Sequence, residues 1–227
     1  TWDTNIWGAP PQPLENLYPG VQIIALDRPG YGDSSNPPRG YTYLAFVEDL
    51  VEVADKLKLE KFCVAGHSSG GPYALAASAL LPDRVVACAA ISSDAPYVHP
   101  KATPEFSKAG IDMNGEALIR SEYFGGKTSE RHVWKPGCLG WVCDYVLERI
   151  EYPFSVEEIA LGERLTIWVG TKDIDCIEQS AKFLQQLIPG AAYREQPRGH
   201  GLKRDLSGNC EFKFLGEIFL ELEKQFV

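Results

Sequence analysis

The fold is decided by the ten residues FCVAGHSSGG at positions 62–71. An apolar run leads into a serine with a glycine two positions before it and another two positions after it, and an Ala- and Leu-rich segment follows. A Gly-x-Ser-x-Gly sequence between a strand and a helix is typical of a tight turn that lifts the serine hydroxyl clear of a sheet. We expect Gly66 and Gly70 to be glycine because side chains there would collide in such a turn. The sequence therefore predicts Ser68 as a nucleophile.

The helix that follows this serine is expected to point its free N–H groups at any negative charge that develops on a substrate oxygen. The backbone N–H of Ser69 is therefore predicted as one oxyanion donor. A phosphate-binding loop would carry Lys where Pro72 stands. A plain strand-to-helix turn would not need glycines on both sides of the serine. We therefore interpret the stretch as a nucleophile turn.

Short β-branched runs alternate with amphipathic stretches on both sides of this turn, which indicates parallel strands joined by crossover helices. The expected strands are residues 21–26, 61–65, 85–91, 165–169 and 192–195, and the expected helices are 42–57, 70–81, 177–187 and 212–226. Residues 95–163 break the alternation because they are rich in Gly, Pro and aromatic residues. We expect an α/β core made of residues 1–94 and 164–227, with residues 95–163 as an insertion, or cap, over one edge of the sheet.

A serine hydroxyl needs a neighbouring base to become a nucleophile at neutral pH. His200 lies between two glycines after the last expected strand, where a loop can carry the ring to Ser68. We interpret His67, His99 and His132 as turn, surface or packing residues.

The acid that orients the histidine is expected after the preceding strand, where Asp173 and Asp175 are the candidates. We favour Asp173, because Asp175 is placed to cap the next helix. The predicted catalytic residues are therefore Ser68, Asp173 and His200.

Composition limits the class of partner. The 227 residues carry a formal net charge of −9, which disfavours nucleic acid and anionic lipid surfaces as partners. No apolar run is long enough to span a bilayer, and the first residues lack the features of a signal peptide.

Cys63 and Cys88 lie in apolar runs and are expected in the core, whereas Cys138 and Cys143 could pair in an oxidising compartment. We expect free thiols, a cytoplasmic location, a small-molecule substrate, and no cofactor or metal. The sequence assigns no oligomeric state.

Several motifs in this order resemble the α/β-hydrolase superfamily from Val21 to Val227. The stretch DRPGYGDS at 27–34 is similar to the family's Asp-x-x-Gly-x-Gly-x-Ser loop, and GGPYALA at 70–76 with LPDRV at 81–85 is similar to esterase-like and aminopeptidase-like members. The resemblance implies a mostly parallel central sheet with helices on both faces and a Ser-Asp-His triad. The family's haloalkane dehalogenases and epoxide hydrolases carry aspartate where this chain has Ser68, which argues against both chemistries.

The chain departs from the family pattern at its beginning. Family members start with further strands and a His-Gly loop whose backbone supplies the second oxyanion donor. Residues 7–10, WGAP, are the candidate for a shortened form of that loop, so the N–H of Gly8 or Ala9 is the predicted second donor. The family also has a strand between those expected at Val21 and Lys61. Either residues 1–7 fill that place, or the chain is part of a longer one.

Three functions fit these residues. The first is hydrolysis of a small ester, thioester or amide through an acyl-enzyme intermediate. The second is a ligand receptor or inactive scaffold with the same fold, as in some plant hormone receptors of this superfamily. The third is a lyase that uses the triad as an acid–base unit. The substrate is not specified by the sequence, and labelling with a fluorophosphonate probe separates a reactive serine from a scaffold.

Overall fold

The structure of the chain is a computed structural model. It describes residues 22–112, 139–173, 178–197 and 199. The chain forms two compact units. One combines Thr1–Tyr41 with Tyr97–Glu151, and the other combines Thr42–Pro96 with Tyr152–Val227. The division into a core of 1–94 and 164–227 and a cap of 95–163 stays a prediction.

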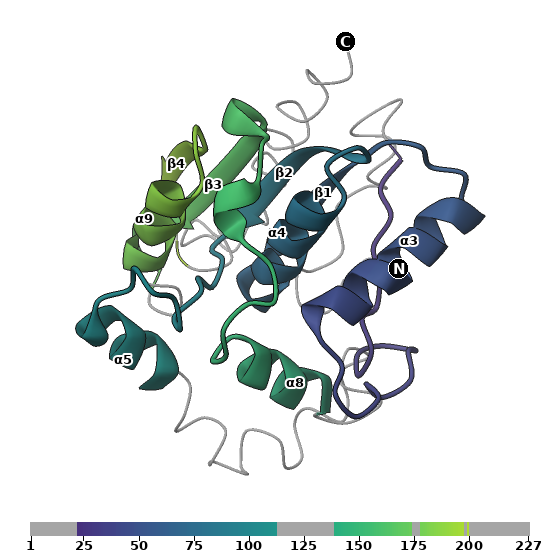
Figure 1. The fold of residues 1–227 in the computed structure, drawn as a ribbon, viewed down its shortest axis with the longest axis horizontal. Coiled ribbons are helices and arrows are strands. Elements are labelled where there is room, and N and C mark those ends of the chain that lie inside the picture. Colours follow the sequence, from purple (N-terminus) through teal and green to yellow (C-terminus); the bar gives the residue numbers. More distant parts are fainter. Residues whose placement is uncertain (1–21, 113–138, 174–177, 198, 200–227) are drawn as a thin grey trace, which may run out of the picture. The chain divides into compact units, whose positions relative to one another are not determined.

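The larger unit, Thr42–Pro96 with Tyr152–Val227, is built on a parallel sheet. Its strands are β1 (Phe62–His67), β2 (Val85–Ile91), β3 (Leu165–Gly170) and β4 (Ala192–Gln196), in that spatial order (Figure 1). Because every pair is parallel, the carboxyl ends of all four strands meet at one edge of the sheet. The strands expected at 61–65, 85–91, 165–169 and 192–195 are confirmed, which also confirms the α/β class.

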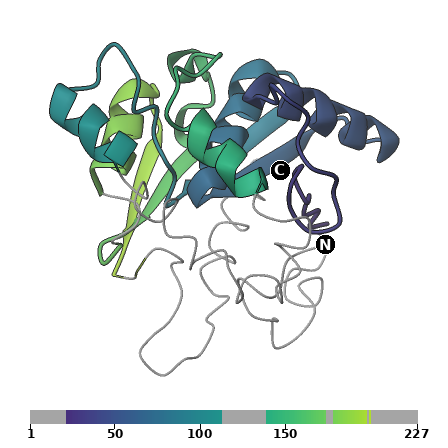
Figure 2. The same cartoon turned by 90° about the horizontal axis from the view of Figure 1, so that it is seen from below.

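Three helices of this unit lie on one face of the sheet (Figure 2). They are α3 (Tyr43–Lys56), α4 (Gly71–Leu80) and α9 (Glu178–Leu187). Helix α4 packs on β1 and β2, and α9 packs on β3 and β4. Residues 71–78 of α4 are all buried, as their Ala- and Leu-rich sequence predicts. The helix expected at 212–226 lies outside the described residues.

Aromatic side chains hold α3 against α4. Tyr43 is fully buried at the start of α3, and its ring meets those of Tyr73 at 4.8 Å and Tyr152 at 5.1 Å in edge-on arrangements. Phe46, one turn further along α3, contacts the same Tyr73 ring at 4.8 Å. Thr42 begins the helix because its side-chain oxygen accepts a hydrogen bond from the Ala45 N–H. This packing holds α4, the helix that begins directly after the turn of Ser68.

The smaller unit contains α5 (Pro104–Asp112) and α8 (Leu139–Leu147) among its described residues. The strand expected at 21–26 is a wrong prediction for the residues described there, because 22–26 form no strand. A strand exists only when its backbone pairs with another strand, and no described strand pairs with this segment. Its side chains still alternate, with Gln22, Ile24 and Leu26 exposed and the two residues between them half-buried. The apolar pattern therefore predicts the alternation of exposed side chains correctly, but it does not predict whether the segment pairs with another strand.

Three cysteines are described, and all three are free thiols. Cys88 is fully buried, and burial raises the pKa of its thiol to about 12. Cys63 is half-buried, and burial raises its pKa to about 11. Thiols with such high pKa values are poor nucleophiles at neutral pH, so these two fit the expected packing role.

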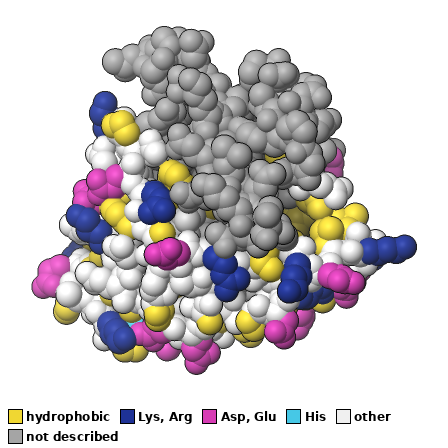
Figure 3. Space-filling view, turned by 90° about the horizontal axis from the view of Figure 1, so that it is seen from above, with side chains coloured by type: hydrophobic (Ala, Val, Ile, Leu, Met, Phe, Trp, Pro, Cys, Tyr) yellow, Lys and Arg dark blue, Asp and Glu magenta, His cyan; other side chains and the backbone are white. Residues whose placement is uncertain are grey.

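No helix in the described ranges is long and apolar enough to cross a membrane. On the face drawn in Figure 3, the described Lys and Arg side chains are interspersed with Asp and Glu side chains. This part of the described surface carries no continuous basic stripe of the kind that binds nucleic acid.

Candidate active site

Ser68 has the strained backbone that a nucleophile turn requires. It follows β1 directly, and its φ is +54°, in the left-handed region that non-glycine residues rarely adopt. A short 3₁₀ turn, η1 (Ser68–Gly70), leads from it into α4 without a connecting loop. The side chain is half-buried. The strand, the strained serine and the helix therefore follow one another as the sequence predicts.

The glycines around this serine have different tasks. A Cβ on Gly66 would lie 2.1 Å from the Gly70 carbonyl oxygen, so a side chain there cannot be accommodated. A Cβ on Gly71 would lie 1.8 Å from the Ser93 hydroxyl oxygen. A Cβ on Gly70, in contrast, meets no described atom within 4 Å. The predicted collision is therefore confirmed for Gly66, whereas among the described residues none would collide with a side chain on Gly70. The second sterically required glycine is Gly71.

The backbone after Ser68 offers N–H groups at the start of a helix. The Gly71 N–H donates to the Ser68 carbonyl, which closes the first turn. Ser69 lies in this first turn, where the N–H groups of a helix have no acceptor within the helix. Because the amino end of α4 carries partial positive charge, the Ser69 N–H has the position and polarity of an oxyanion donor. Its assignment as a donor stays a prediction.

Strand register places the expected catalytic residues at one edge. His67, the last residue of β1, pairs with Ile91, the last residue of β2, and Ile91 pairs with Trp168 of β3, which continues two residues further to Gly170. Ser68 lies one residue beyond this level on β1, and Asp173 lies in the turn after β3. Adjacent strands are about 4.8 Å apart, so the two strands that carry these residues are separated by one strand, or about 10 Å.

Asp173 lies in a closed turn. Its N–H donates to the Gly170 carbonyl at 2.9 Å, and the Thr171 N–H donates to the Gln196 carbonyl of β4 at 2.8 Å. A Cβ on Gly199 would lie 3.7 Å from the Lys172 carbonyl oxygen, in ordinary van der Waals contact. The residue before His200 therefore lies against the residue before Asp173. His200, Asp175, Gly8 and Ala9 themselves lie outside the described residues, so the triad and the second donor stay predictions.

Sequence reasoning missed the polar residues that follow β2. Ser92 has φ +41°, and its hydroxyl is buried with no hydrogen-bond partner among the described residues. Ser93 and Asp94 are 2% and 7% exposed. Because β2 lies between β1 and β3, this segment lies between the turn of Ser68 and the turn of Asp173. The sequence signal that could have identified this segment is its run of polar residues directly after the apolar residues of β2.

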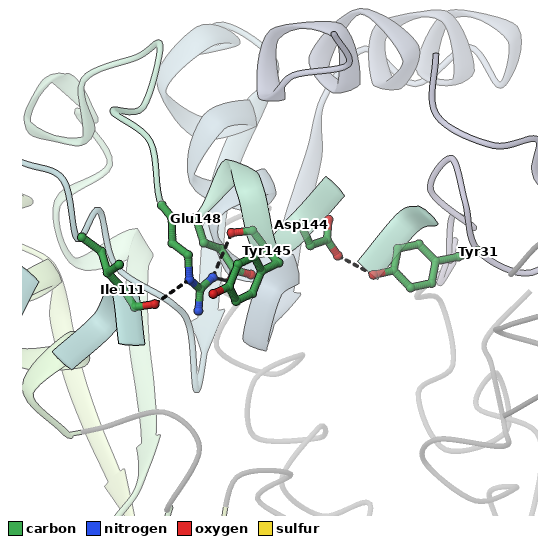
Figure 4. Close-up of polar contacts among 6 residues, drawn as sticks. Tyr31, Ile111, Asp144, Tyr145 and Glu148 are labelled. Carbon is green, nitrogen blue, oxygen red and sulfur yellow. Dashed lines mark hydrogen bonds and ion pairs between the residues drawn. The ribbon is translucent and has the colours of Figure 1, made fainter. Parts of the chain in front are cut away.

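In the smaller unit, the loop at 27–34 is joined to α8 by a charged cluster. Arg28 forms two parallel hydrogen bonds with Asp144, at 2.7 and 2.8 Å. The Tyr31 hydroxyl donates to Asp144 at 2.6 Å (Figure 4). Burial, followed by the charge of Asp144, raises the pKa of Tyr31 well above its usual value. The backbones also touch, since a Cβ on Gly30 would lie 2.4 Å from the Gly140 Cα. The loop and the helix are therefore tightly joined.

A second charged cluster lies at the carboxyl end of α8. Arg149 pairs with Glu148 at 3.0 Å, lies 3.5 Å over the Tyr145 ring, and donates to the Ile111 carbonyl at the end of α5 (Figure 4). This unit also contains a hollow of about 360 Å³ beside α5, lined in part by Tyr97, His99 and Ile111. None of these residues was predicted to be catalytic. The described residues contain no group of His, Cys, Asp and Glu side chains suited to a metal ion.

Comparison with known proteins identifies the family. The model described as "alpha/beta hydrolase fold" matches residues 6–117, which include the turn of Ser68 and the strand β2. The chain belongs to the α/β-hydrolase superfamily. Among curated members of known name, it is 36% identical over 76 residues to a putative 2-succinyl-6-hydroxy-2,4-cyclohexadiene-1-carboxylate synthase of Bacillus subtilis. This alignment covers 33% of the chain and 28% of that protein.

Two further curated relatives are named for different activities. A serine hydrolase-like protein of Danio rerio is 39% identical over 66 residues, covering 28% of this α/β-hydrolase chain and 20% of the relative. Bifunctional epoxide hydrolase 2 of Sus scrofa is 31% identical over 87 residues, covering 37% of the chain and 16% of the relative. The aligned stretch thus spans less than a third of each relative's length.

Solved structures extend the likeness of fold over most of the chain. An esterase from Exiguobacterium antarcticum superposes with a TM-score of 0.60 at 21% identity, covering 87% of the chain and 78% of the esterase. A thermophilic esterase from Thermogutta terrifontis gives a TM-score of 0.62 at 17% identity, covering 88% and 78%. Identities this low show the shared fold, and both of these neighbours are esterases.

Proposed function

We propose that this chain is a serine hydrolase that cleaves a small ester, thioester or amide through an acyl-enzyme intermediate. The observation that carries the proposal is the left-handed backbone of Ser68, with φ +54°, at a strand-to-helix turn. Backbone strain of this kind costs free energy and is concentrated at functional sites. A turn that merely joined β1 to α4 would not need it.

The choice of reaction depends on the residue at the turn. The chain matches an epoxide hydrolase at 31% identity, yet epoxide hydrolases of this family use aspartate as the nucleophile. A serine hydroxyl attacks an acyl carbon and forms an ester that water can hydrolyse, whereas opening an epoxide with serine would leave a stable ether. Acyl transfer therefore fits Ser68 better than the chemistry of that relative.

The proposed reaction has two halves. The Ser68 Oγ attacks the carbonyl carbon while His200 takes the hydroxyl proton, and Asp173 stabilises the imidazolium that forms. The Ser69 N–H and the N–H of Gly8 or Ala9 hold the oxyanion, and His200 then gives its proton to the leaving group. Water attacks the acyl-serine with His200 again as the base, which releases the acid and restores Ser68. No cofactor takes part in these steps.

Labelling with a fluorophosphonate probe tests the proposal. The purified chain should form a covalent adduct, seen as a mass increase on Ser68, and should hydrolyse an activated p-nitrophenyl ester. Ser68→Ala should do neither, although its thermal unfolding midpoint stays the same because the change empties no packed cavity. Ser69→Ala is the matched control, since it keeps the backbone N–H and should still be labelled. A folded parent chain that takes up no probe would instead indicate a receptor or scaffold.

A further inference from the structure

The amino end of α4 is closely approached by residues from two strands. Helix α4 packs across β1 and β2 (Figure 1). On β1, a Cβ on Gly66 would lie 2.1 Å from the Gly70 carbonyl oxygen and 2.9 Å from the Gly71 Cα. In the segment after β2, the Ser93 hydroxyl oxygen would lie 1.8 Å from a Cβ on Gly71. The Ser93 hydroxyl therefore occupies the space that a side chain of residue 71 would take.

Ser93 is itself held in one place. It is 2% exposed, and its hydroxyl donates to the Asp94 carbonyl at 2.8 Å. The N–H of the preceding residue, Ser92, donates to the Trp168 carbonyl at 2.7 Å, which ties the segment to β3. Closely packed interiors transmit strain instead of absorbing it, so a buried and hydrogen-bonded side chain resists displacement by a neighbour. Ser93 is thus a rigid support for the start of α4.

The support extends to the predicted oxyanion donor through one residue. The Gly71 N–H donates to the Ser68 carbonyl and closes the turn that runs from Ser68 to Gly70. Ser69 is the middle residue of that turn, and its N–H is the predicted donor. A shift of Gly71 therefore moves the turn and changes the direction of the Ser69 N–H. A donor stabilises an oxyanion only when it lies about 3 Å from the place where the charge develops.

We propose that Ser93 is a positioning residue, which fixes the amino end of α4 and thereby aims the Ser69 N–H at the oxyanion. This inference rests on the proposed function. Ser93 makes no bond to substrate and exchanges no proton. Its effect is confined to states with a negative oxygen, which are the tetrahedral intermediates and the transition states beside them. A serine that only filled space in the core would change stability without changing the affinity for an oxyanion.

An exchange of size between residues 71 and 93 tests this role. Gly71→Ala places a methyl group on the Ser93 hydroxyl, so the turn must shift, and we expect kcat to fall about a hundredfold or more. In the double variant Gly71→Ala with Ser93→Gly, the methyl group fills the space that the Ser93 side chain has left. The nearest described atom is then the Cα of residue 93, at 3.1 Å. The double variant should exceed Gly71→Ala in kcat by about tenfold or more.

Two measurements on Ser93→Ala separate the aim of the donor from stability. On a p-nitrophenyl ester, kcat should fall about tenfold or more with KM changed less than about twofold, because the oxyanion forms only after substrate has bound. A trifluoromethyl ketone forms a negatively charged hemiketal with the nucleophilic serine, so its inhibition constant should rise by about the same factor. Titration with the fluorophosphonate gives the concentration of active protein, so a lower yield of folded protein does not imitate the effect.

Ser78→Ala is the matched control. Ser78 is also 2% exposed, and its hydroxyl also donates to a backbone carbonyl, that of Ala74, at 2.8 Å. It lies near the carboxyl end of α4, so the same substitution removes the same kind of buried hydrogen bond without touching the turn of Ser68. Ser78→Ala should keep the parental kcat, KM and inhibition constant, even where its unfolding midpoint falls as far as that of Ser93→Ala.

The outcomes distinguish this inference from the proposed function. If Ser68→Ala retains turnover, the proposed function itself is wrong. If Ser68→Ala abolishes turnover but Ser93→Ala keeps the parental kcat and inhibition constant, the hydrolase stands and the role of Ser93 is overturned. That role is also overturned if the double variant is no faster than Gly71→Ala, or if Ser78→Ala weakens the inhibitor as much as Ser93→Ala does. If Ser93→Ala yields no folded protein, the comparison of the double variant with Gly71→Ala decides.

Discussion

Ser68 and Ser92 occupy equivalent positions on adjacent strands and share a left-handed backbone. Each follows one member of the registered pair His67 and Ile91, and their φ angles are +54° and +41°. Such a conformation costs a non-glycine residue about 1–3 kcal/mol and persists only where neighbouring contacts enforce it. At Ser68 the contact is the approach of Gly66 to the Gly70 backbone, and at Ser92 it is the hydrogen bond to Trp168. Strain is thus concentrated at the edge where the chemistry is proposed.

The two glycines of the Gly-x-Ser-x-Gly sequence should respond differently to alanine. Gly66→Ala places a methyl group 2.1 Å from the Gly70 carbonyl oxygen, so the turn must open and Ser68 must move. We expect loss of fluorophosphonate labelling and a lower unfolding midpoint. Gly70→Ala has φ −76° and no atom of the described residues within 4 Å of its Cβ, so this variant should be labelled at close to the parental rate. Equal loss in both variants would show that the turn differs from the one described.

Substitutions of the two aspartates after β3, Asp173 and Asp175, should differ in their effect on kcat. Asp173→Asn is expected to lower kcat by about 10⁴-fold, because asparagine favours the wrong tautomer of the histidine. Asp175→Asn should cost less than about tenfold, as expected of a helix cap. Both variants should keep the unfolding midpoint within a few degrees, measured by circular dichroism. A larger loss of kcat in Asp175→Asn would exchange the two assignments.

The sequence predicted what depends on local pattern. Apolar runs and helical spacing identified β1 to β4 and α3, α4 and α9, and the serine between glycines identified the turn at Ser68. It did not predict contacts between distant segments, such as that of Arg28 with Asp144, 116 residues apart. Nor did it predict a left-handed Ser92, because serine has no local preference for that conformation. The expected strand at 21–26 failed for a related reason, since pairing is a tertiary property that alternation alone cannot supply.

The aromatic contacts of α3 predict a contrast between neighbouring residues. Tyr43 is fully buried between the rings of Tyr73 and Tyr152, whereas Leu44 is 40% exposed. Tyr43→Ala removes a large core side chain and should lower the free energy of unfolding by about 3–5 kcal/mol. Leu44→Ala should lower it by less than about 1 kcal/mol. Urea denaturation measures both values.

The charged cluster of the smaller unit gives the last prediction. Asp144 is 3% exposed at its side chain and accepts hydrogen bonds from both Arg28 and Tyr31. Asp144→Asn leaves the Arg28 charge without its carboxylate in a partly buried place, and removal of one partner of such a pair typically costs about 3 kcal/mol. Because Arg28 belongs to the loop at 27–34 and Asp144 belongs to α8, we expect limited proteolysis of Asp144→Asn to cut faster within 27–34 and 139–147.

Asp112 provides the control for this variant. It also pairs with a basic residue, Lys108 one turn earlier on α5, but both side chains are well exposed to water. Surface pairs contribute little to stability, so Asp112→Asn should leave the unfolding midpoint and the proteolysis pattern as in the parent chain. If Asp144→Asn were as stable and as resistant to protease as Asp112→Asn, the Gly30–Gly140 contact alone would have to hold the loop on the helix. Gly140→Ala would then be the disruptive change, because its Cβ would lie 2.7 Å from the Gly30 carbonyl oxygen.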